Sequence, residues 1–307
     1  MKNTKKMLSL ILSVCLILCC SVTAFAAELG TEKEVPSHSI TINEYDVYVA
    51  TREATDEELA RNGVSEKHAA LVKSNAIENE LTKLSKLSFD ELRNLGYTNS
   101  QIDILKNYSG ERIETNSNLR GIFADMTAEF FDVAASSSSL SVRVDWEWTN
   151  VPVLAGEAIE DMVAIRWQGT NYAGQPINVA LDSAGSSCTV KYYNRGSSQS
   201  YQYSRYPDVS SDDPYGHAYA KIPMSPGEGN WIGDHYAKKG SFTIKVDKVG
   251  SNSIKEAAFV FGYGHTVIVI SPSLSLPASF GIGFSWGTET MAEEAIRMDN
   301  TGNITEY

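Results

Sequence analysis

The sequence has little cysteine with which to stabilise a fold. Three of its four cysteines, Cys15, Cys19 and Cys20, lie in an N-terminal segment that we expect to be removed, so Cys188 would be the only one left. A single cysteine cannot form an internal disulfide, even in a compartment that permits one. A hydrophobic core must therefore supply the stability.

The apolar run at the N-terminus is too short for a membrane anchor. Three lysines precede the apolar stretch Met7–Cys20, which falls short of the roughly 20 residues that span a bilayer. Ala24 and Ala26 place small residues at both positions that a signal peptidase recognises. The pattern predicts a signal peptide over residues 1–26 and a secreted, extracellular protein with no stable membrane anchor.

Basic residues are scarce relative to acidic ones. The chain has 26 basic and 38 acidic residues, and removal of three signal-peptide lysines leaves 23 against 38, a net charge of −15. Nucleic acids and anionic membranes both select for Lys and Arg, so this balance argues against them as partners. The 281 residues that remain of 307 suffice for one large domain with a small companion.

The clearest pattern that is present is the alternation of apolar and polar residues in 140–148. Such alternation is typical of a half-buried antiparallel strand. Its apolar face consists of Leu140, Val142, Val144, Trp146 and Trp148. A second alternating stretch, Phe280–Trp286, repeats the pattern, and Trp167 is assigned to the core as well.

Many further short apolar runs, separated by Gly, Pro, Asn and Ser, follow without intervening helices. The predicted strands are 124–133, 140–148, 162–167, 177–181, 188–193, 218–222, 241–246, 257–263, 266–270 and 279–286. Together they predict a mainly antiparallel β-sandwich over residues 122–307, jelly-roll-like or immunoglobulin-like in outline.

The part of the chain before this domain has a helical period. Capping boxes, in which Ser or Thr precedes Glu or Gln by three residues, occur at Thr55 with Glu58, Ser88 with Glu91, and Thr98 with Gln101. Glycines that can end these helices are Gly63, Gly96 and Gly110. The pattern predicts a helical unit over residues 55–115, preceded by a leader and a short extended arm over residues 27–54.

Two further segments complete the predicted α+β layout. Asn116–Gly121 is interpreted as a linker between the helical unit and the β domain. Thr290 with Glu293 forms another capping box and predicts a short C-terminal helix over residues 291–298.

The run S-x-x-E-L-x-x-x-G-Y-T-x-x-Q-I, from Ser88 to Ile102, lies within this layout of signal peptide, capped helices and Ser- and Tyr-rich β domain. In these features the chain resembles exported proteins of Gram-positive bacteria that have no assigned function. The resemblance implies export, and it brings no activity or site residues with it.

The sequence Gly283-Phe284-Ser285-Trp286-Gly287 matches the G-x-S-x-G motif of serine hydrolases. In those enzymes the catalytic histidine follows the serine, whereas the last histidine here is His265. Only 22 residues follow Ser285 at position 285 of 307, which leaves no room for the rest of such a fold. We therefore interpret Ser285 as the polar face of a strand and predict no catalytic residue.

The sequence also contains few candidate metal ligands. The histidines His217, His235 and His265 do not have the spacing of zinc enzymes. Asp208, Asp212 and Asp213 could join a Ca²⁺ shell, but they lack the EF-hand order of donors and are favoured as a solvated loop. No metal or cofactor is predicted.

The most suggestive region for function is 196–236, which is rich in Tyr and poor in aliphatic residues. Aromatic rings with polar edges, set in loops, are typical of binding surfaces. The candidate ligand-binding residues are Tyr203, Tyr206, Tyr215, Trp231 and Tyr236. The competing interpretation is that these rings cover the ends of the sandwich and hold a long loop in place.

The sequence thus favours a secreted, non-enzymatic protein that binds a glycan, a cell-envelope polymer or a protein partner through Tyr-rich loops. One alternative is a secreted serine hydrolase that uses Ser285. Another is a membrane-active β protein in which the alternating stretches 136–144 and 271–285 form amphipathic hairpins.

Overall fold

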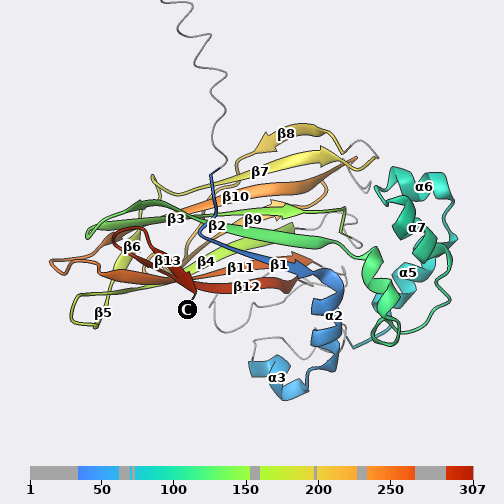
Figure 1. Ribbon diagram of the computed structural model, residues 1–307, viewed down its shortest axis with the longest axis horizontal. Helices are drawn as coiled ribbons and strands as arrows, with labels where there is room; N and C mark the ends of the chain where they lie inside the picture. Colours follow the sequence, from blue (N-terminus) through green and yellow to red (C-terminus); the bar gives the residue numbers. More distant parts are fainter. Residues whose placement is uncertain are drawn as a thin grey trace, which may run out of the picture. The chain divides into compact units, whose positions relative to one another are not determined.

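The structure is a computed structural model that describes residues 34–61, 70, 73–152, 160–196, 199–226, 234–266 and 288–306. Within these ranges, two antiparallel sheets form one compact unit with the helices, over residues 36–307 (Figure 1). The described part of the chain contains no helix that is both long and apolar enough to span a membrane.

Sheet A is the larger of the two described sheets. Its strands, in spatial order, are β1 (His38–Asn43), β2 (Asp125–Ala135), β3 (Ser139–Trp148), β10 (His235–Lys248), β7 (Ser187–Asn194) and β8 (Tyr201–Arg205), with β6 (Val179–Leu181) also paired to β10. Every pairing is antiparallel, as short strands joined without helical crossovers require.

Sheet B is built in the same way. Its strands are β13 (Ile304–Glu306), β12 (Thr288–Asp299), β11 (Glu256–Thr266), β4 (Glu160–Thr170) and β5 (Pro176–Ile177), with β9 (His217–Pro223) also paired to β4. These pairings are antiparallel too. The structure therefore confirms the prediction of a mainly antiparallel fold of two β-sheets.

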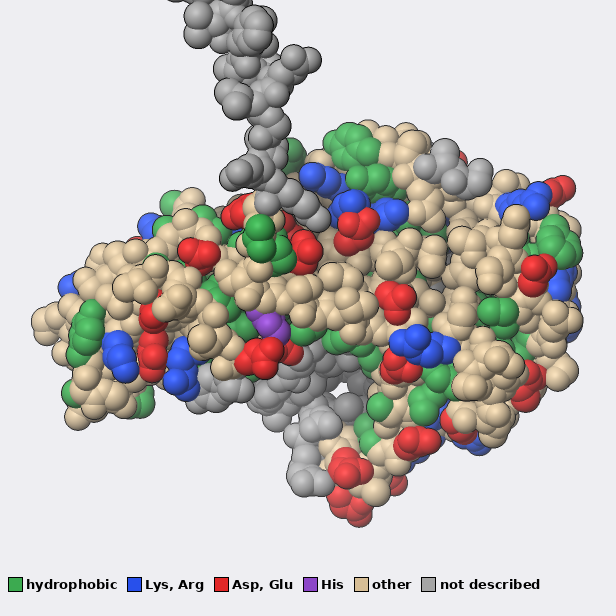
Figure 2. All heavy atoms as spheres, viewed as in Figure 1, with side chains coloured by type: hydrophobic (Ala, Val, Ile, Leu, Met, Phe, Trp, Pro, Cys, Tyr) green, Lys and Arg blue, Asp and Glu red, His purple; other side chains and the backbone are tan. Residues whose placement is uncertain are grey.

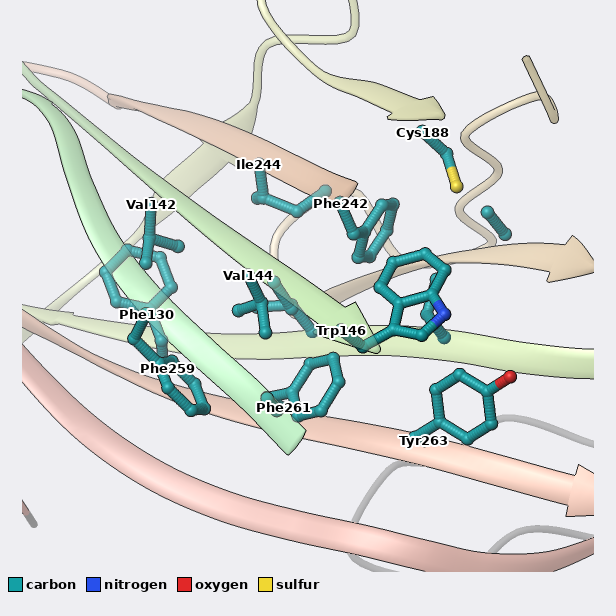
Figure 3. Packing of buried hydrophobic residues seen from close by; sticks show 14 of the residues in the cluster. Phe130, Val142, Val144, Trp146, Cys188, Phe242, Ile244, Phe259, Phe261 and Tyr263 are labelled. Atoms are coloured by element: carbon teal, nitrogen blue, oxygen red, sulfur yellow. The ribbon is translucent and has the colours of Figure 1, made fainter. Parts of the chain in front are cut away.

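The core forms between the two sheets because each strand buries alternate side chains. All five apolar residues predicted on one face of β3 are buried, and so is Trp167 on β4. Figure 3 shows Trp146 beside Tyr263 of the opposite sheet, at a ring-centroid distance of 5.8 Å. Phe130 and Phe261 meet edge to face at 5.7 Å, a geometry that favours aromatic pairs.

The helices carry a smaller second core. They are α2 (Glu44–Glu53), α3 (Asp56–Arg61), α5 (Ala76–Lys86), α6 (Phe89–Asn94) and α7 (Asn99–Lys106). The three capping boxes predicted for residues 55–115 form the expected hydrogen bonds. Gly96 directly follows the α6 C-cap Leu95 and has a positive φ of 95°, which glycine adopts most readily where a helix ends. Gly110 has a φ of 97° but lies three residues beyond Asn107, the C-cap of α7.

A buried ion cluster stabilises this helical core. Arg52 on α2 donates hydrogen bonds to Glu78 on α5 and, at 2.8 Å, to Glu114. The core also contacts the sheets, since Glu44 Oε2 accepts a 2.7 Å hydrogen bond from the Ala124 amide, just before β2.

The prediction that Asn116–Gly121 is a linker is wrong, because this segment is folded. Residues 113–122 contain two short 3-10 helices, η1 (Ile113–Thr115) and η2 (Ser117–Ile122). Leu119 and Ile122 are buried in the helical core. The segment is thus packed structure, because these two apolar side chains lie three residues apart and share one face.

The predicted C-terminal helix over 291–298 is also wrong. These residues belong to β12, which pairs with β11 along Glu256–Thr266. Ile296 and Met298 are buried and lie two residues apart, which is the period of a strand. Pairing with a neighbouring strand here outweighs the local capping signal.

The extended arm predicted near Ser39 is half correct. β1 occupies His38–Asn43, but a helix begins at Glu44, because the Asn43 side chain caps it by accepting a 2.9 Å hydrogen bond from the Tyr45 amide. Several other predictions lie outside the described residues: the signal peptide, Gly63, residues 267–270 and the Phe280–Trp286 strand.

Candidate binding site

The best candidate site lies at the edge of sheet A formed by β8. The sequence Tyr201–Arg205 carries large side chains at alternate positions, which favours a strand, and β8 pairs with β7 along one side only. Tyr203 stacks on Tyr192 of β7, with ring centroids 4.9 Å apart and planes 15° apart. This aromatic pair fixes the edge strand on the sandwich.

Arg205 continues this stack at the end of β8. Its guanidinium carbon lies 5.5 Å from the ring centroid of Tyr192 and 5.7 Å from that of Tyr203. Cation–π contacts of this kind hold the guanidinium plane in place. Among the described residues, no side-chain hydrogen bond or salt bridge of Arg205 accompanies these ring contacts.

An open groove of about 440 Å³ lies beside Arg205, between the chain that follows β8 and strands β4 and β9 of sheet B. We call it the edge groove. Its lining consists of Glu160, Arg205, Tyr206, Pro207, Asp208, Ser210, Tyr219, Lys221 and Pro223. Its volume falls within the range of about 300–1,000 Å³ that small-molecule sites occupy.

The lining combines aromatic rings with charges of both signs. Tyr206 is 75% exposed and lines the groove. Tyr219 is held by two backbone hydrogen bonds to Ser210, of 2.8 and 2.9 Å. Lys221 of β9 and Glu160 of β4 form a salt bridge of 3.7 Å. The groove can thus offer a flat apolar ring, N–H donors and carboxylate acceptors to one ligand.

The five residues predicted from the sequence are not brought together. Tyr206 lines the groove and Tyr203 supports it, whereas Tyr215 is 53% exposed in the turn before β9 and does not line it. Tyr236 is fully buried on β10. Trp231 lies outside the described residues. The expectation that these rings sit in exposed loops is therefore wrong for Tyr203 and Tyr236, which belong to strands.

The sequence analysis did not single out Glu160, Arg205 or Lys221, which are the other charged residues of the groove beside Asp208. The alternation of Tyr201, Tyr203 and Arg205 could have identified β8 as a strand. The groove itself depends on how the chain after β8 meets β9, which no local pattern encodes.

The acidic loop before β9 has partners of its own. Asp212 Oδ1 lies 2.5 Å from Nε2 of the buried His217, and hydrogen bonding to this imidazole lowers the pKa of the Asp212 carboxyl. Asp213 accepts a 3.1 Å hydrogen bond from the Tyr215 amide. Within the described ranges, no three His, Cys, Asp or Glu side chains converge as metal ligands.

Candidate nucleophiles gain no support from the described residues. Burial raises the pKa of the Cys188 thiol to about 12, so this thiol stays protonated near neutral pH. Ser285 lies outside the described residues, as do residues 271–285. The hydrolase and membrane-active alternatives therefore stay predictions.

No protein-family model and no curated protein matches the sequence. Among solved structures, a collagen-binding domain from a Staphylococcus aureus adhesin is 8% identical and has a TM-score of 0.28, with 56% of this chain and 97% of that domain covered. AvmM, which catalyses macrocyclization in alchivemycin A biosynthesis, is 10% identical with a TM-score of 0.27, over 57% of this chain and 88% of that one.

A third solved structure contains manganese lipoxygenase of Gaeumannomyces graminis and part of zonadhesin of Komagataella pastoris. It is 10% identical with a TM-score of 0.23, over 60% of this chain and 57% of that one. Similarity at these TM-scores assigns neither a family nor a function to the chain.

Proposed function

We propose that this protein is a secreted, non-enzymatic binding protein that holds a glycan segment, such as part of a cell-envelope polymer, in the edge groove. The observation that carries the proposal is that the exposed Tyr206 lines the same groove as Arg205 and Asp208. A sugar presents an apolar C–H face and a rim of hydroxyl groups. The aromatic ring can stack on the C–H face, and the charged groups can form hydrogen bonds with the hydroxyl groups.

The composition of the lining favours a glycan over a lipid or another apolar ligand. Apart from Pro207 and Pro223, no described residue of the groove lining is aliphatic, while four of the lining side chains are charged. An apolar ligand would take these charges out of water without offering them hydrogen bonds, which is costly. A polyhydroxylated ligand can exchange its water for hydrogen bonds to them.

The groove is also fixed before a ligand arrives. Tyr192 and Tyr203 hold Arg205 from one side, and the Tyr192 hydroxyl donates a 2.8 Å hydrogen bond to the Pro223 carbonyl on the groove wall. Side chains that are already ordered lose less conformational entropy on binding. A modest contact area can therefore give measurable affinity.

The test is a pull-down of the purified protein on insoluble polysaccharides and peptidoglycan, compared with the variants Tyr206→Ala and Tyr215→Ala. Both tyrosines are more than half exposed, but only Tyr206 lines the groove. Loss of a central aromatic contact typically costs at least about 1–2 kcal/mol of binding, so Tyr206→Ala should reduce affinity about 5- to 30-fold. Tyr215→Ala should bind like the parent.

An equal effect of both substitutions, in variants with parental melting temperatures, would refute the role of the edge groove. Failure of the parent to bind any of these polymers would refute the proposed function itself.

A further inference from the structure

A second surface lies on the outer face of sheet A, where β7, β8 and β10 are neighbours. It consists of Lys191, Tyr193, Tyr201, Lys238 and Lys239, and we call it the tyrosine–lysine patch. The ammonium groups of Lys238 and Lys239 lie 5.6 and 6.0 Å from the Tyr193 ring centroid. Tyr201 meets Tyr193 edge to face at 5.8 Å. Figure 2 shows basic side chains gathered over these strands, beside a hydrophobic cluster.

The positive charge of this patch is only partly balanced. Lys191 and Lys239 lie directly opposite each other in the register of β7 and β10, a position in which like charges repel. Lys239 forms a 2.8 Å salt bridge with Glu147 of β3. Lys191 has no salt bridge to a described residue, and Lys238 donates to the neutral Gln199 Oε1 at 2.8 Å.

The surroundings of Lys238 disfavour the charged form of its ammonium group. Burial lowers the pKa of its ammonium group, and the attraction of Glu147 and the repulsion of Lys239 act in opposite directions on it. The pKa of Lys238 therefore lies below its usual value. An anion placed between the lysines would favour the charged form of each.

The residue that holds Lys238 has a strained backbone. Gln199 has a φ of 37°, a left-handed conformation that is uncommon for a residue other than glycine. Such conformations cost on the order of 1 kcal/mol and are found preferentially at ligand clamps and functional loops. Here the conformation accompanies the contact of the Gln199 amide with the Lys238 ammonium.

We propose that the tyrosine–lysine patch is a second binding site, distinct from the edge groove, which takes a carboxylate or phosphate group carried on a polymer. Three ammonium groups with one carboxylate among them suit an isolated anionic group, and the exposed Tyr201 ring suits the uncharged part of the ligand beside it. The site stands independently of the proposed function of the groove.

Nucleic acid fits the same surface poorly. Its phosphates follow one another so densely that many basic contacts are needed to bind them. Outside the patch the acidic residues outnumber the basic ones, since the formal net charge of the whole chain is −12. A polymer with single anionic groups along an otherwise neutral backbone avoids repulsion by the remaining surface.

The experiment measures binding of the whole protein to methyl-esterified polygalacturonate in which a minority of the carboxylates are free, to the fully methyl-esterified form and to inorganic phosphate. The first two have the same sugar backbone and differ only in charge, while the third carries phosphate without sugar. The parent should bind the partly esterified polymer or phosphate at least tenfold more tightly than the full ester, and salt should weaken that binding.

The variants assign the binding to the patch. Lys191→Gln and Lys238→Gln should each reduce affinity for the anionic probe about fivefold, which is the effect expected for one lysine at an anionic surface. Lys255→Gln removes an exposed lysine outside the patch and should change nothing. The difference in affinity between the partly and the fully esterified polymer should persist in Tyr206→Ala, which separates this site from the proposed function of the edge groove.

Equal binding of the partly and the fully esterified polymer overturns the proposal, as does a loss with Lys255→Gln as large as that with Lys191→Gln. Binding of neither anionic probe by the folded parent also overturns it. Binding of double-stranded DNA more tightly than of both probes would reject the proposed ligand class.

Discussion

Gly240 on β10 tests how tightly the sheet A core is packed. It lies opposite Trp146 in the register of β10 and β3. A Cβ atom added to Gly240 would lie 1.9 Å from Cζ2 and 2.3 Å from Cη2 of the Trp146 ring. Both distances are far below van der Waals contact. The ring itself has little room to move, because Trp146 is buried and packs against Tyr263.

We therefore expect Gly240→Ala to lower the free energy of unfolding by about 3 kcal/mol, near the upper end of the 1–3 kcal/mol typical of an overpacked core. For a domain of this size, each kcal/mol lowers the melting temperature by about 2–4 °C. Urea unfolding followed by tryptophan fluorescence measures the change directly.

Gly196→Ala is the matched control, since no heavy atom of the described residues lies within 4 Å of a Cβ added there. It should change stability by no more than about 0.5 kcal/mol. Replacing Trp146 by the smaller Phe should relieve the clash, so the double variant with Gly240→Ala should lose less stability than the sum of the two single variants. A Gly240→Ala variant as stable as the parent, or strictly additive losses, would refute this account of the core.

Two further predictions concern buried polar groups. Tyr263→Phe should cost about 1.5–3 kcal/mol of stability, because its hydroxyl donates a 2.7 Å hydrogen bond to the buried Asp161 carboxylate. Tyr236→Phe should cost no stability, because that buried hydroxyl has no hydrogen-bond partner among the described residues. Thermal unfolding measures both variants, and a similar loss of stability in the two would contradict this prediction. Burial acts to raise the pKa of Glu78, but hydrogen bonds, including those from Arg52, outweigh it and lower the pKa below 4.5. The resulting stabilisation is complete above about pH 4.5 and is lost as the pH falls through the folded pKa. Between pH 5 and 3, the free energy of unfolding measured in urea should therefore fall less steeply with decreasing pH in Glu78→Gln than in the parent. The same pH dependence in both proteins would refute this prediction.

The fold could be predicted where the local sequence pattern agreed with the tertiary structure around it. In β3, alternation alone identified the buried residues Val142, Val144 and Trp146, because a strand has a period of two wherever one face is covered. The helix caps at Ser88 and Thr98 were equally predictable, since their hydrogen bonds form within four residues. These elements need no knowledge of the rest of the chain.

The prediction of secondary structure failed where pairing with a strand distant in the sequence determined the structure. Residues 291–298 contain a capping-box signal, yet pairing with β11 makes them a strand. Tyr206 and Tyr236 have the same side chain in the same Tyr-rich region, but one is exposed and the other is fully buried. Composition could indicate a region rich in aromatic rings. Strand register decides which rings face solvent.

The register of β8 also explains how one short strand contributes to two surfaces. Tyr203 pairs with Tyr192, but a β-bulge shifts the next pair, so that Tyr201 pairs with Tyr193. Gln202 is the extra residue in β8. Because a shift of one residue moves every following side chain to the other face of a strand, this bulge separates Tyr201 from Tyr203. Tyr203 supports the edge groove and Tyr201 joins the tyrosine–lysine patch, so the two proposed sites lie on opposite faces of the same strand and can bind independently.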